Sequence, residues 1–403
     1  MNYLIIGNGV AGTTAAETIR KYDADGKIII FSREDRLFYS RIRLPDYIAG
    51  KVDETGIILK KKDWYSDLNI ILHLNEEVSV VDPGNKTITT ADGKTCSYDR
   101  LLLATGGTAS LPTIPGRELP GVYTLRTLAE ARKIRDHAVH AQNPALIGGG
   151  VLGLEIASSI KTLTNKEVIV VEYFDRLLPR QMDLPGATIL RARLEEMGLR
   201  FFLASRTEEI IGADTLSAVR LVGGRQFSAD LLIIAAGMTP DVRLAIAAEI
   251  KVEQGIVVND SLTTSIPDIY AAGDPAQHRG MIYGIWPAAQ KQGEVAGANM
   301  AGHEMTYPGT TRANTLKVAG IDLFSIGDID PEGKCESALF TDAGRFIYQK
   351  FVFSGEFLAG AILLGDVRLR GIVSRVINNK QPVSEAMRKK LKAGNPEALL
   401  EAG

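Results

Sequence analysis

Two glycine-rich turns stand where an apolar strand passes into a helix, and both have the spacing of a phosphate-binding turn. The first is GNGVAG, which follows the apolar run YLII and contains Gly7, Gly9 and Gly12. In a Gly-x-Gly-x-x-Gly turn, the first glycine makes the tight bend, the second admits a pyrophosphate and the third lets helix pack on strand. The helix N-terminus then faces the negative charge. The stretch therefore predicts a dinucleotide diphosphate site.

The second turn, GGGVLG, repeats this design with Gly148, Gly150 and Gly153. An acid follows each turn after about 20 residues, which is the spacing of a ribose-hydroxyl acceptor. These acids are Glu34 and Glu172. A carboxylate at the second position repels a 2′-phosphate and so favours NADH over NADPH, although Arg176 nearby weakens that preference. One such motif alone is a weak signal; two, each followed by an acid, predict two bound dinucleotides, one flavin and one nicotinamide.

Composition excludes several other classes of protein. The chain has 403 residues with 46 basic and 48 acidic side chains, so its net charge of −2 gives no reason to expect nucleic acid as a partner. Cys96 and Cys335 are too few for a disulfide framework, which favours a reduced, cytoplasmic protein. No apolar run is long enough to span a membrane. The five histidines do not combine with cysteine at a metal spacing, so no metal site is expected.

The order of the motifs resembles the pyridine nucleotide-disulfide oxidoreductase superfamily, in the branch that lacks a redox disulfide. The segments YSRIRL, DRLLPRQMD, IYAAGD and NTLKVAGIDLFSIGD carry this resemblance. Within the branch, they are most similar to NADH:rubredoxin reductases and to the flavin part of nitrite reductase large subunits. The resemblance implies an α/β fold with two Rossmann-like three-layer dinucleotide-binding domains and a C-terminal α+β domain. Its implied boundaries are 1–110 with 241–307 for FAD, 111–240 for NAD and 308–403 for a C-terminal interface domain.

The resemblance also assigns cofactor contacts beyond the glycines and acids. It implies that Asp274 bonds the ribityl chain of FAD, that the Val78 backbone meets the adenine, and that Trp286 opens a helix pointing at the flavin ring. For Trp286, a plain core aromatic is the alternative. Thr105 and Gly106, in a small-residue turn after a strand, and Arg126 are further expected contacts; for Arg126 the alternative is an arginine on a helix face.

Four charged residues are expected at the reacting ring. They are Arg41, Arg43, Glu155 and Lys317. The resemblance places Glu155 and Lys317 near the flavin. Arg41 and Arg43 lie in LFYSRIRLPDYIAGK, which the resemblance reads as a helix passing the flavin; Arg41 is the better match by position, and for Arg43 the alternative is a contact with a partner. The alternative for the acid and its bases is a salt bridge between domains. Hydride transfer needs the two rings to be positioned and their charge stabilised, and it needs no separate nucleophile.

The stretch from Arg36 to Lys51 contains no cysteine, which disfavours a disulfide or peroxide reductase. The leading prediction is an FAD-dependent NADH oxidoreductase that passes electrons to a small redox protein such as rubredoxin or ferredoxin. The alternatives are an NADH oxidase or diaphorase, the flavin subunit of a nitrite-reductase-like complex with a partner subunit, and a redox-sensing flavoprotein. A homodimer is compatible with the resemblance.

Overall fold

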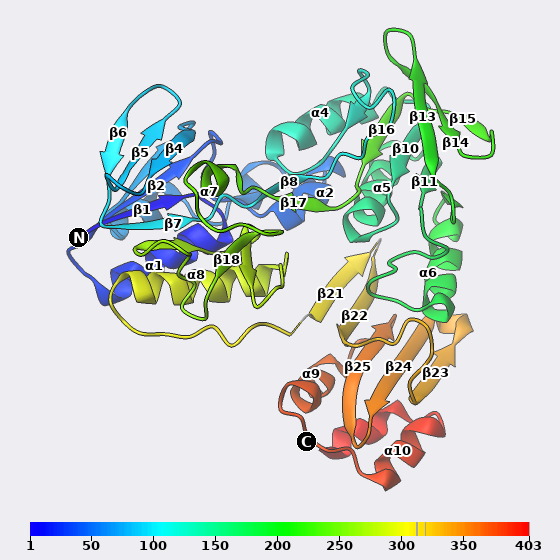
Figure 1. The fold of residues 1–403 in the computed structure, drawn as a ribbon. Coiled ribbons are helices and arrows are strands. Elements are labelled where there is room, and N and C mark those ends of the chain that lie inside the picture. The colour runs from blue at the N-terminus through cyan, green and yellow to red at the C-terminus, as the bar shows by residue number, and fades with distance from the viewer. Residues whose placement is uncertain (312, 319, 403) are drawn as a thin grey trace. The chain divides into compact units, whose positions relative to one another are not determined.

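A computed structural model describes residues 1–311, 313–318 and 320–402 (Figure 1). The chain forms two compact units. Unit 1 comprises Met1–Arg41, Glu54–Thr108 and Met238–Thr310. Unit 2 comprises Ile42–Asp53, Ala109–Gly237 and the described residues from Thr311 onward. The chain therefore leaves unit 1 and returns to it, as a domain inserted into another would require.

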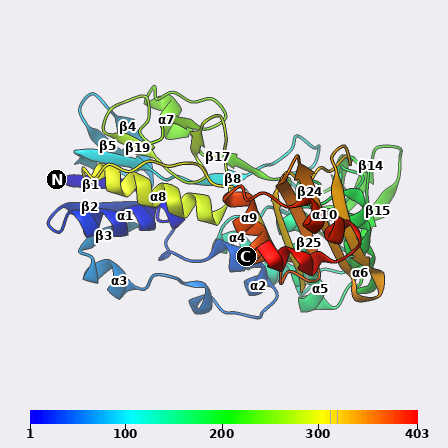
Figure 2. The ribbon, with the colours of Figure 1, turned by 90° about the horizontal axis from the view of Figure 1, so that it is seen from below.

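Unit 1 is built on a parallel sheet in the order β19-β7-β1-β2-β3. Its strands are β1 (Asn2–Ile6), β2 (Lys27–Ser32), β3 (Ile70–Leu74), β7 (Arg100–Leu103) and β19 (Ile269–Ala271). Apart from their first residues, the strands β1, β2 and β7 are buried, as is all of β19, which fits a parallel sheet covered on both faces. The edge strand β3 is only partly buried, with Ile71 exposed. Helices α1 (Val10–Tyr22) and α8 (Trp286–Met300) run side by side (Figure 1, Figure 2). Gly293 and Gly297 allow this approach, because a Cβ at either would lie about 2.5 Å or less from an α1 carbonyl oxygen.

Smaller elements complete unit 1. An antiparallel sheet contains β4 (Val78–Asp82), β5 (Thr87–Thr90) and β6 (Thr95–Ser97), and two short helices are α3 (Lys62–Asp67) and α7 (Arg243–Ala247). The strands β8 (Gly107–Ala109) and β17 (Met238–Pro240), where the chain leaves and re-enters the unit, pair with each other. β18 (Ile256–Val258) pairs in parallel with β20 (Ala276–His278).

Unit 2 repeats the Rossmann-like design. Its parallel sheet has the order β12-β11-β10-β16-β9, from β9 (Val122–Tyr123), β10 (Pro144–Ile147), β11 (Val168–Val171), β12 (Leu199–Phe202) and β16 (Leu231–Ile234). Its helices are α2 (Leu44–Ile48), α4 (Leu128–Ala138), α5 (Val151–Thr164) and α6 (Leu184–Glu196). The strands β13 (Thr207–Gly212), β14 (Leu216–Leu221) and β15 (Gln226–Ser228) form an antiparallel sheet.

The C-terminal part of unit 2 is an antiparallel sheet with helices packed on it. The sheet order is β21-β22-β25-β24-β23, from β21 (Ala313–Val318), β22 (Ile321–Gly327), β23 (Ser337–Asp342), β24 (Ile347–Ser354) and β25 (Phe357–Leu364). Side chains of α9 (Arg370–Asn378) and α10 (Glu385–Lys392) share a core with the sheet. The predicted fold class, two Rossmann-like domains and a C-terminal α+β domain, is confirmed. The predicted domain boundaries stay a prediction.

The single helix predicted from Leu37 to Lys51 is wrong, because the stretch is only partly helical. Tyr39 forms a β-bridge with Ile58, a 3-10 turn covers Arg41–Arg43, and α2 is only five residues long. Pro45 explains the late start, since proline fits the first helical turn but donates no N–H. Among the helices in the described part of the chain, none is both long and apolar enough to cross a membrane.

Candidate functional sites

In the first glycine turn, two of the three glycines are packed against backbone and the remaining one faces open space. A Cβ at Gly7, whose φ is +121°, would lie 2.0 Å from the Ala104 carbonyl oxygen. A Cβ at Gly12 would lie 2.0 Å from the Gly7 carbonyl oxygen, whereas a Cβ at Gly9 would meet nothing within 4 Å. The outer two glycines are therefore required by packing. The middle one leaves room for a ligand against the backbone.

The second turn has the same stereochemistry. A Cβ at Gly148 (φ +114°) would lie 2.3 Å from the Ala235 carbonyl oxygen, and one at Gly153 would lie 2.0 Å from the Gly148 oxygen. Again the middle position, Gly150, faces open space. No acid occupies the first turn of α1 or of α5. Both helix N-termini are thus suited to a diphosphate, so the residues fit one dinucleotide in each unit.

The acids after the two turns are held differently. Glu34 Oε1 accepts from Arg41 Nη2 at 2.6 Å, and its Oε2 accepts from the Tyr39 hydroxyl at 2.6 Å. Glu172 is buried and accepts from the backbone N–H groups of Gly149 at 2.5 Å and Phe174 at 2.8 Å. Arg41 therefore lies with the predicted ribose acceptor of unit 1. Glu172 ties the end of β11 directly to the second glycine turn.

The carboxyl edge of the unit 1 sheet gathers several predicted contacts, which is where ligands bind in open α/β sheets. The Glu34 carbonyl accepts from Asn75 N–H, three residues before Val78, which begins β4. Thr105 and Gly106 follow β7 at the same edge, and Asp274 follows β19 after two residues. The structure thus brings these positions to one edge of one sheet. Their roles at FAD stay proposals.

Asp241 is a residue of this edge that the sequence reasoning missed. Its backbone N–H donates to the Gly106 carbonyl, and its carbonyl accepts from the Thr105 hydroxyl at 2.7 Å. Its buried carboxylate pairs with Arg243 at 2.9 Å and Arg33 at 3.1 Å. These two arginines hold the pKa of Asp241 below the usual range of an aspartate, and the hydrogen bond from Arg243 has the largest effect. The only signal was its place after GMTP, which read as a simple chain break.

A second missed connection runs from the first glycine turn to α8. The Tyr65 hydroxyl donates to Asn8 Oδ1 at 2.9 Å and accepts from Phe38 N–H at 3.2 Å. The Phe38 ring contacts Trp286, the first residue of α8, with centroids 5.8 Å apart. Asn8 Nδ2 is buried and has no hydrogen-bond partner within the part of the chain that is described. A polar donor without a partner inside this turn fits a bound phosphate or ribose oxygen.

Glu155, Arg43 and Lys317 all belong to unit 2. Glu155 lies in α5, which contacts both α2 and β21, the strand carrying the exposed Lys317. The pKa of Glu155 is raised to about 7, first by burial of its carboxyl group and second by the negative charge of Asp46. Asp46 itself lies 3.9 Å from Arg43. Among the described residues we find no ion pair between Glu155 and Lys317, so the expected pairing stays a proposal.

The raised pKa makes stability depend on pH. An unfolded glutamate titrates near 4.5, so the folded state loses stability as pH rises from there through about 7, by up to about 3 kcal/mol. We expect Glu155→Gln to match the parent near pH 5 and to be more stable than it at pH 8, measured by urea unfolding. Glu167→Gln, at an exposed acid of the same unit, is the control. Parallel stability curves for Glu155→Gln and the parent between pH 5 and 8 would contradict this.

Arg126 lies in unit 2, just before Thr127, the N-cap of α4. Its backbone N–H donates to Glu130 Oε2 at 2.9 Å, beside the capping box that Thr127 and Glu130 form. It therefore precedes the helix and does not lie on its face. Its contact with a cofactor stays a prediction.

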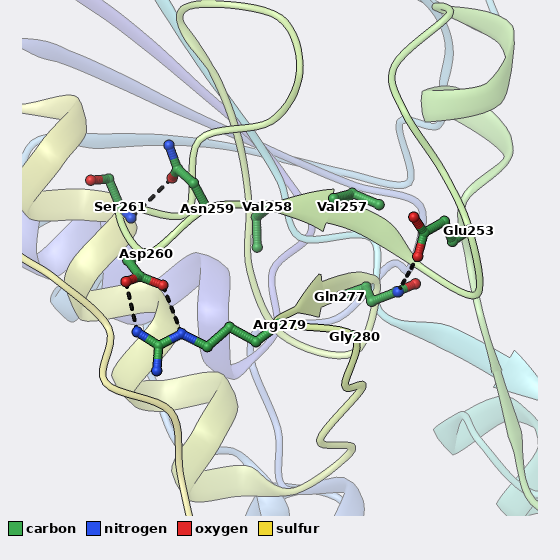
Figure 3. Close-up of a pocket in the computed structure, with 9 residues that line it drawn as sticks. All are labelled: Glu253, Val257, Val258, Asn259, Asp260, Ser261, Gln277, Arg279 and Gly280. Carbon is green, nitrogen blue, oxygen red and sulfur yellow. Dashed lines mark hydrogen bonds and ion pairs between the residues drawn. The ribbon is translucent and has the colours of Figure 1, made fainter.

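A hollow of about 500 Å³ opens on unit 1 beside the paired strands β18 and β20, lined in part by the residues that follow each strand (Figure 3). Its rim carries a bidentate pair between Asp260 and Arg279, with distances of 3.0 and 2.7 Å. Hydrogen bonds with Arg279 first and then with the buried His278 lower the pKa of Asp260 to about 2. None of the predicted cofactor contacts lines this hollow, so we assign it no part in the two dinucleotide sites.

Two family models match the chain. One, described as pyridine nucleotide-disulphide oxidoreductase, matches residues 1–293. The other, described as the rubredoxin NAD+ reductase C-terminal domain, matches residues 313–381.

Individual relatives cover nearly the whole chain. The assimilatory nitrate reductase electron transfer subunit of Bacillus subtilis is 36% identical over 91% of this chain and 48% of its own length. The NADH-rubredoxin oxidoreductase of Clostridium acetobutylicum is 32% identical over 94% of both chains. A solved ferredoxin reductase from Rhodopseudomonas palustris has a TM-score of 0.91 and 25% identity, covering 100% of this chain and 99% of its own. The chain spans about half the length of the nitrate and nitrite reductase relatives.

Proposed function

Because the chain belongs to the pyridine nucleotide-disulphide oxidoreductase family, we propose that it is an FAD-dependent NADH oxidoreductase that passes electrons to a small redox protein. The family, the fold class and the assignment to the oxidoreductases, with FAD and NADH as cofactors, agree with the sequence-based predictions and are confirmed. Rubredoxin or ferredoxin is the proposed class of acceptor, since relatives are named for both.

The observation that carries the proposal is the duplicated turn. Each unit holds one turn in which two glycines are fixed by packing and the middle one faces open space. Two separate dinucleotides can therefore bind at once, which hydride transfer between them requires. FAD, when bound, accepts two electrons as a hydride and can deliver them one at a time.

The chain's own residues then have positioning and electrostatic roles. Gly9 and Gly150 admit the two diphosphates, and the N-termini of α1 and α5 stabilise their charge. Glu34, oriented by Arg41 and Tyr39, accepts a ribose hydroxyl. Glu155, about half protonated near neutral pH, can either donate or accept a hydrogen bond. Its place by the flavin ring, with Arg43 and Lys317, is part of the proposal.

The cysteines support an exit for electrons that uses no thiol. Cys96 lies in β6 of the small antiparallel sheet, opposite Ile88, and Cys335 is exposed in the C-terminal part of unit 2. Neither follows one of the strands whose carboxyl ends gather the predicted FAD contacts. A redox relay would need a thiolate beside the flavin. The proposed route therefore leads from flavin directly to an acceptor outside the chain.

An anaerobic two-step experiment tests the function. Mixing the FAD-loaded protein with NADH should bleach the flavin faster than NADPH does. The reduced protein is then titrated against rubredoxin, ferredoxin, oxygen and a disulfide, and rapid reoxidation by one of the carrier proteins is expected. Faster bleaching by NADPH would overturn the assignment of NADH. Reoxidation by oxygen alone would favour an NADH oxidase.

A second candidate is the flavin part of a nitrite-reductase-like complex. It is favoured by the half-length match to the nitrate and nitrite reductase relatives. In that case, reoxidation by the carrier proteins would be slow and a partner reductase subunit would be needed. The homodimer stays a prediction. The cytoplasmic location also stays a prediction, with which the two free thiols are compatible.

A further inference from the structure

A cluster of buried polar side chains lies in unit 2 between α6 and the C-terminal sheet. Lys350, on β24, places Nζ 3.2 Å from Asp183 Oδ2 and donates to the Asp330 carbonyl at 2.7 Å. The Tyr348 hydroxyl donates to Asp183 Oδ2 at 2.6 Å. None of the four residues is more than 5% exposed. Buried charges in a folded protein require partners, and here each has at least one.

The two carboxylates of the cluster are satisfied in different ways. Asp330 accepts from the backbone N–H groups of Lys334 at 2.8 Å and Cys335 at 3.0 Å, while Lys350 lies 3.8 Å away. Asp183 is the N-cap of α6 and accepts from the Gly186 N–H. The polar partners of its other oxygen, Oδ2, are Lys350 and the Tyr348 hydroxyl. Both of these residues come from the C-terminal sheet.

The segment before Asp183 leads directly to the second glycine turn. Leu178 N–H donates to the carbonyl of Gly149, the residue between Gly148 and Gly150, at 3.0 Å. Leu178 is fully buried and has φ +50°, a left-handed conformation that costs a branched side chain energy and persists only when its surroundings enforce it. Its carbonyl accepts from Gln181 and Met182 N–H at 2.8 and 2.9 Å.

The other end of the same segment is fixed by the C-terminal sheet. The Tyr348 ring lies so close to Gly186 that a Cβ there would be 2.8 Å from its Cδ1 atom. Met182, which is fully buried, lies as close to that position through its terminal methyl. The segment from Leu178 to Gly186 therefore spans between the glycine turn and β24, with a hydrogen-bonded or packed contact at each end.

We propose that Lys350, Tyr348 and Asp183 are positioning residues for NADH: through Leu178 they hold the second glycine turn in its binding geometry. The C-terminal sheet thus sets the affinity of the nicotinamide site, although none of its residues is assigned a contact with NADH. The inference rests on the proposed function, because it takes Gly148–Gly153 to be the NADH turn.

The test compares nucleotide binding with stability in the FAD-loaded protein. Tyr348→Phe removes one hydroxyl, and Asp183→Asn keeps the N-cap but removes its charge. Each should raise the dissociation constant of NAD+, measured by calorimetry on the oxidised protein, by about tenfold. KM for NADH should rise by a similar factor, with little change in kcat and with the FAD content preserved. Amide exchange at Leu178 in the nucleotide-free protein should become faster.

A matched control separates positioning from plain loss of stability. Val373→Ala truncates a fully buried side chain in the core beneath the C-terminal sheet, so it should lower the melting temperature and leave NAD+ affinity unchanged. A double variant that restores the charge balance of the cluster tests whether NAD+ affinity can be recovered. Lys350→Met leaves two buried acids, and adding Asp183→Asn to it should recover part of the lost affinity.

Each outcome decides a different question. Wild-type affinity in both Tyr348→Phe and Asp183→Asn would overturn the positioning role while leaving the proposed function intact. Equal weakening by Val373→Ala would also overturn it, because affinity would then follow stability alone. A parent protein that binds neither NAD+ nor NADH would overturn the proposed function and this inference together.

Discussion

Gly12→Ala is expected to give a protein that folds poorly and is recovered without FAD. The added Cβ would lie 2.0 Å from the Gly7 carbonyl oxygen and 3.1 Å from an Ile5 methyl, so backbone would have to move. Overpacking of this kind costs on the order of 3 kcal/mol, and more where backbone has to move. At an ordinary helix position the same change would instead stabilise by up to about 1 kcal/mol, so even the sign is informative. The measurements are the flavin absorbance per protein and the thermal midpoint.

Two further alanine variants make this result interpretable. Gly9→Ala points its Cβ into open space, so the protein should fold normally and yet bind FAD weakly, since the methyl would occupy the diphosphate side of the turn. Gly371→Ala, in α9, also meets nothing within 4 Å and should keep both FAD and stability. A yellow, stable Gly12→Ala protein would show that α1 does not pack on the turn as described.

How far the sequence alone leads depends on the kind of feature. The glycine turns, the strands before them and the helix at Trp286 were predictable, because close backbone packing leaves only glycine possible at fixed spacings. The helix expected across Leu37 to Lys51 is too long, because Pro45 and the bridge between Tyr39 and Ile58 override local propensity. Periodicity does not reveal such tertiary effects.

The candidate site shows the same limit more sharply. Arg41 is expected at the reacting ring, and its partner in the structure is Glu34, seven residues away in the chain. Its place at the ring stays a prediction. Asp241 joins Thr105 across 136 residues, a pairing with no local pattern. The cluster of Asp183 and Lys350 is equally non-local. A charged residue in a sequence indicates what chemistry is available. The residue with which it pairs, and therefore its role, is determined by the fold.

Gly153→Ala is expected to produce the complementary defect: the same overlap destabilises unit 2, so the folded protein keeps FAD in unit 1 and loses NADH. The new Cβ would lie 2.0 Å from the Gly148 carbonyl oxygen and 3.1 Å from its carbon, so the second turn must shift while the first is untouched. A displacement of about 1 Å can cost on the order of a hundredfold in rate when reacting groups must be aligned. Anaerobic stopped-flow should therefore show flavin bleaching by NADH slowed at least about a hundredfold.

Chemical reduction separates this defect from a damaged flavin site. Dithionite should reduce the Gly153→Ala flavin as it reduces the parent, because that route bypasses the nicotinamide turn. Gly150→Ala, whose Cβ meets nothing within 4 Å, should keep normal stability and still lose NADH affinity. Loss of FAD from Gly153→Ala would mean that the two turns do not act as separate sites. Unchanged bleaching by NADH would place the nicotinamide cofactor elsewhere. Reciprocal losses at Gly12 and Gly153 are what one dinucleotide per unit requires, because each turn's packing is complete within its own unit.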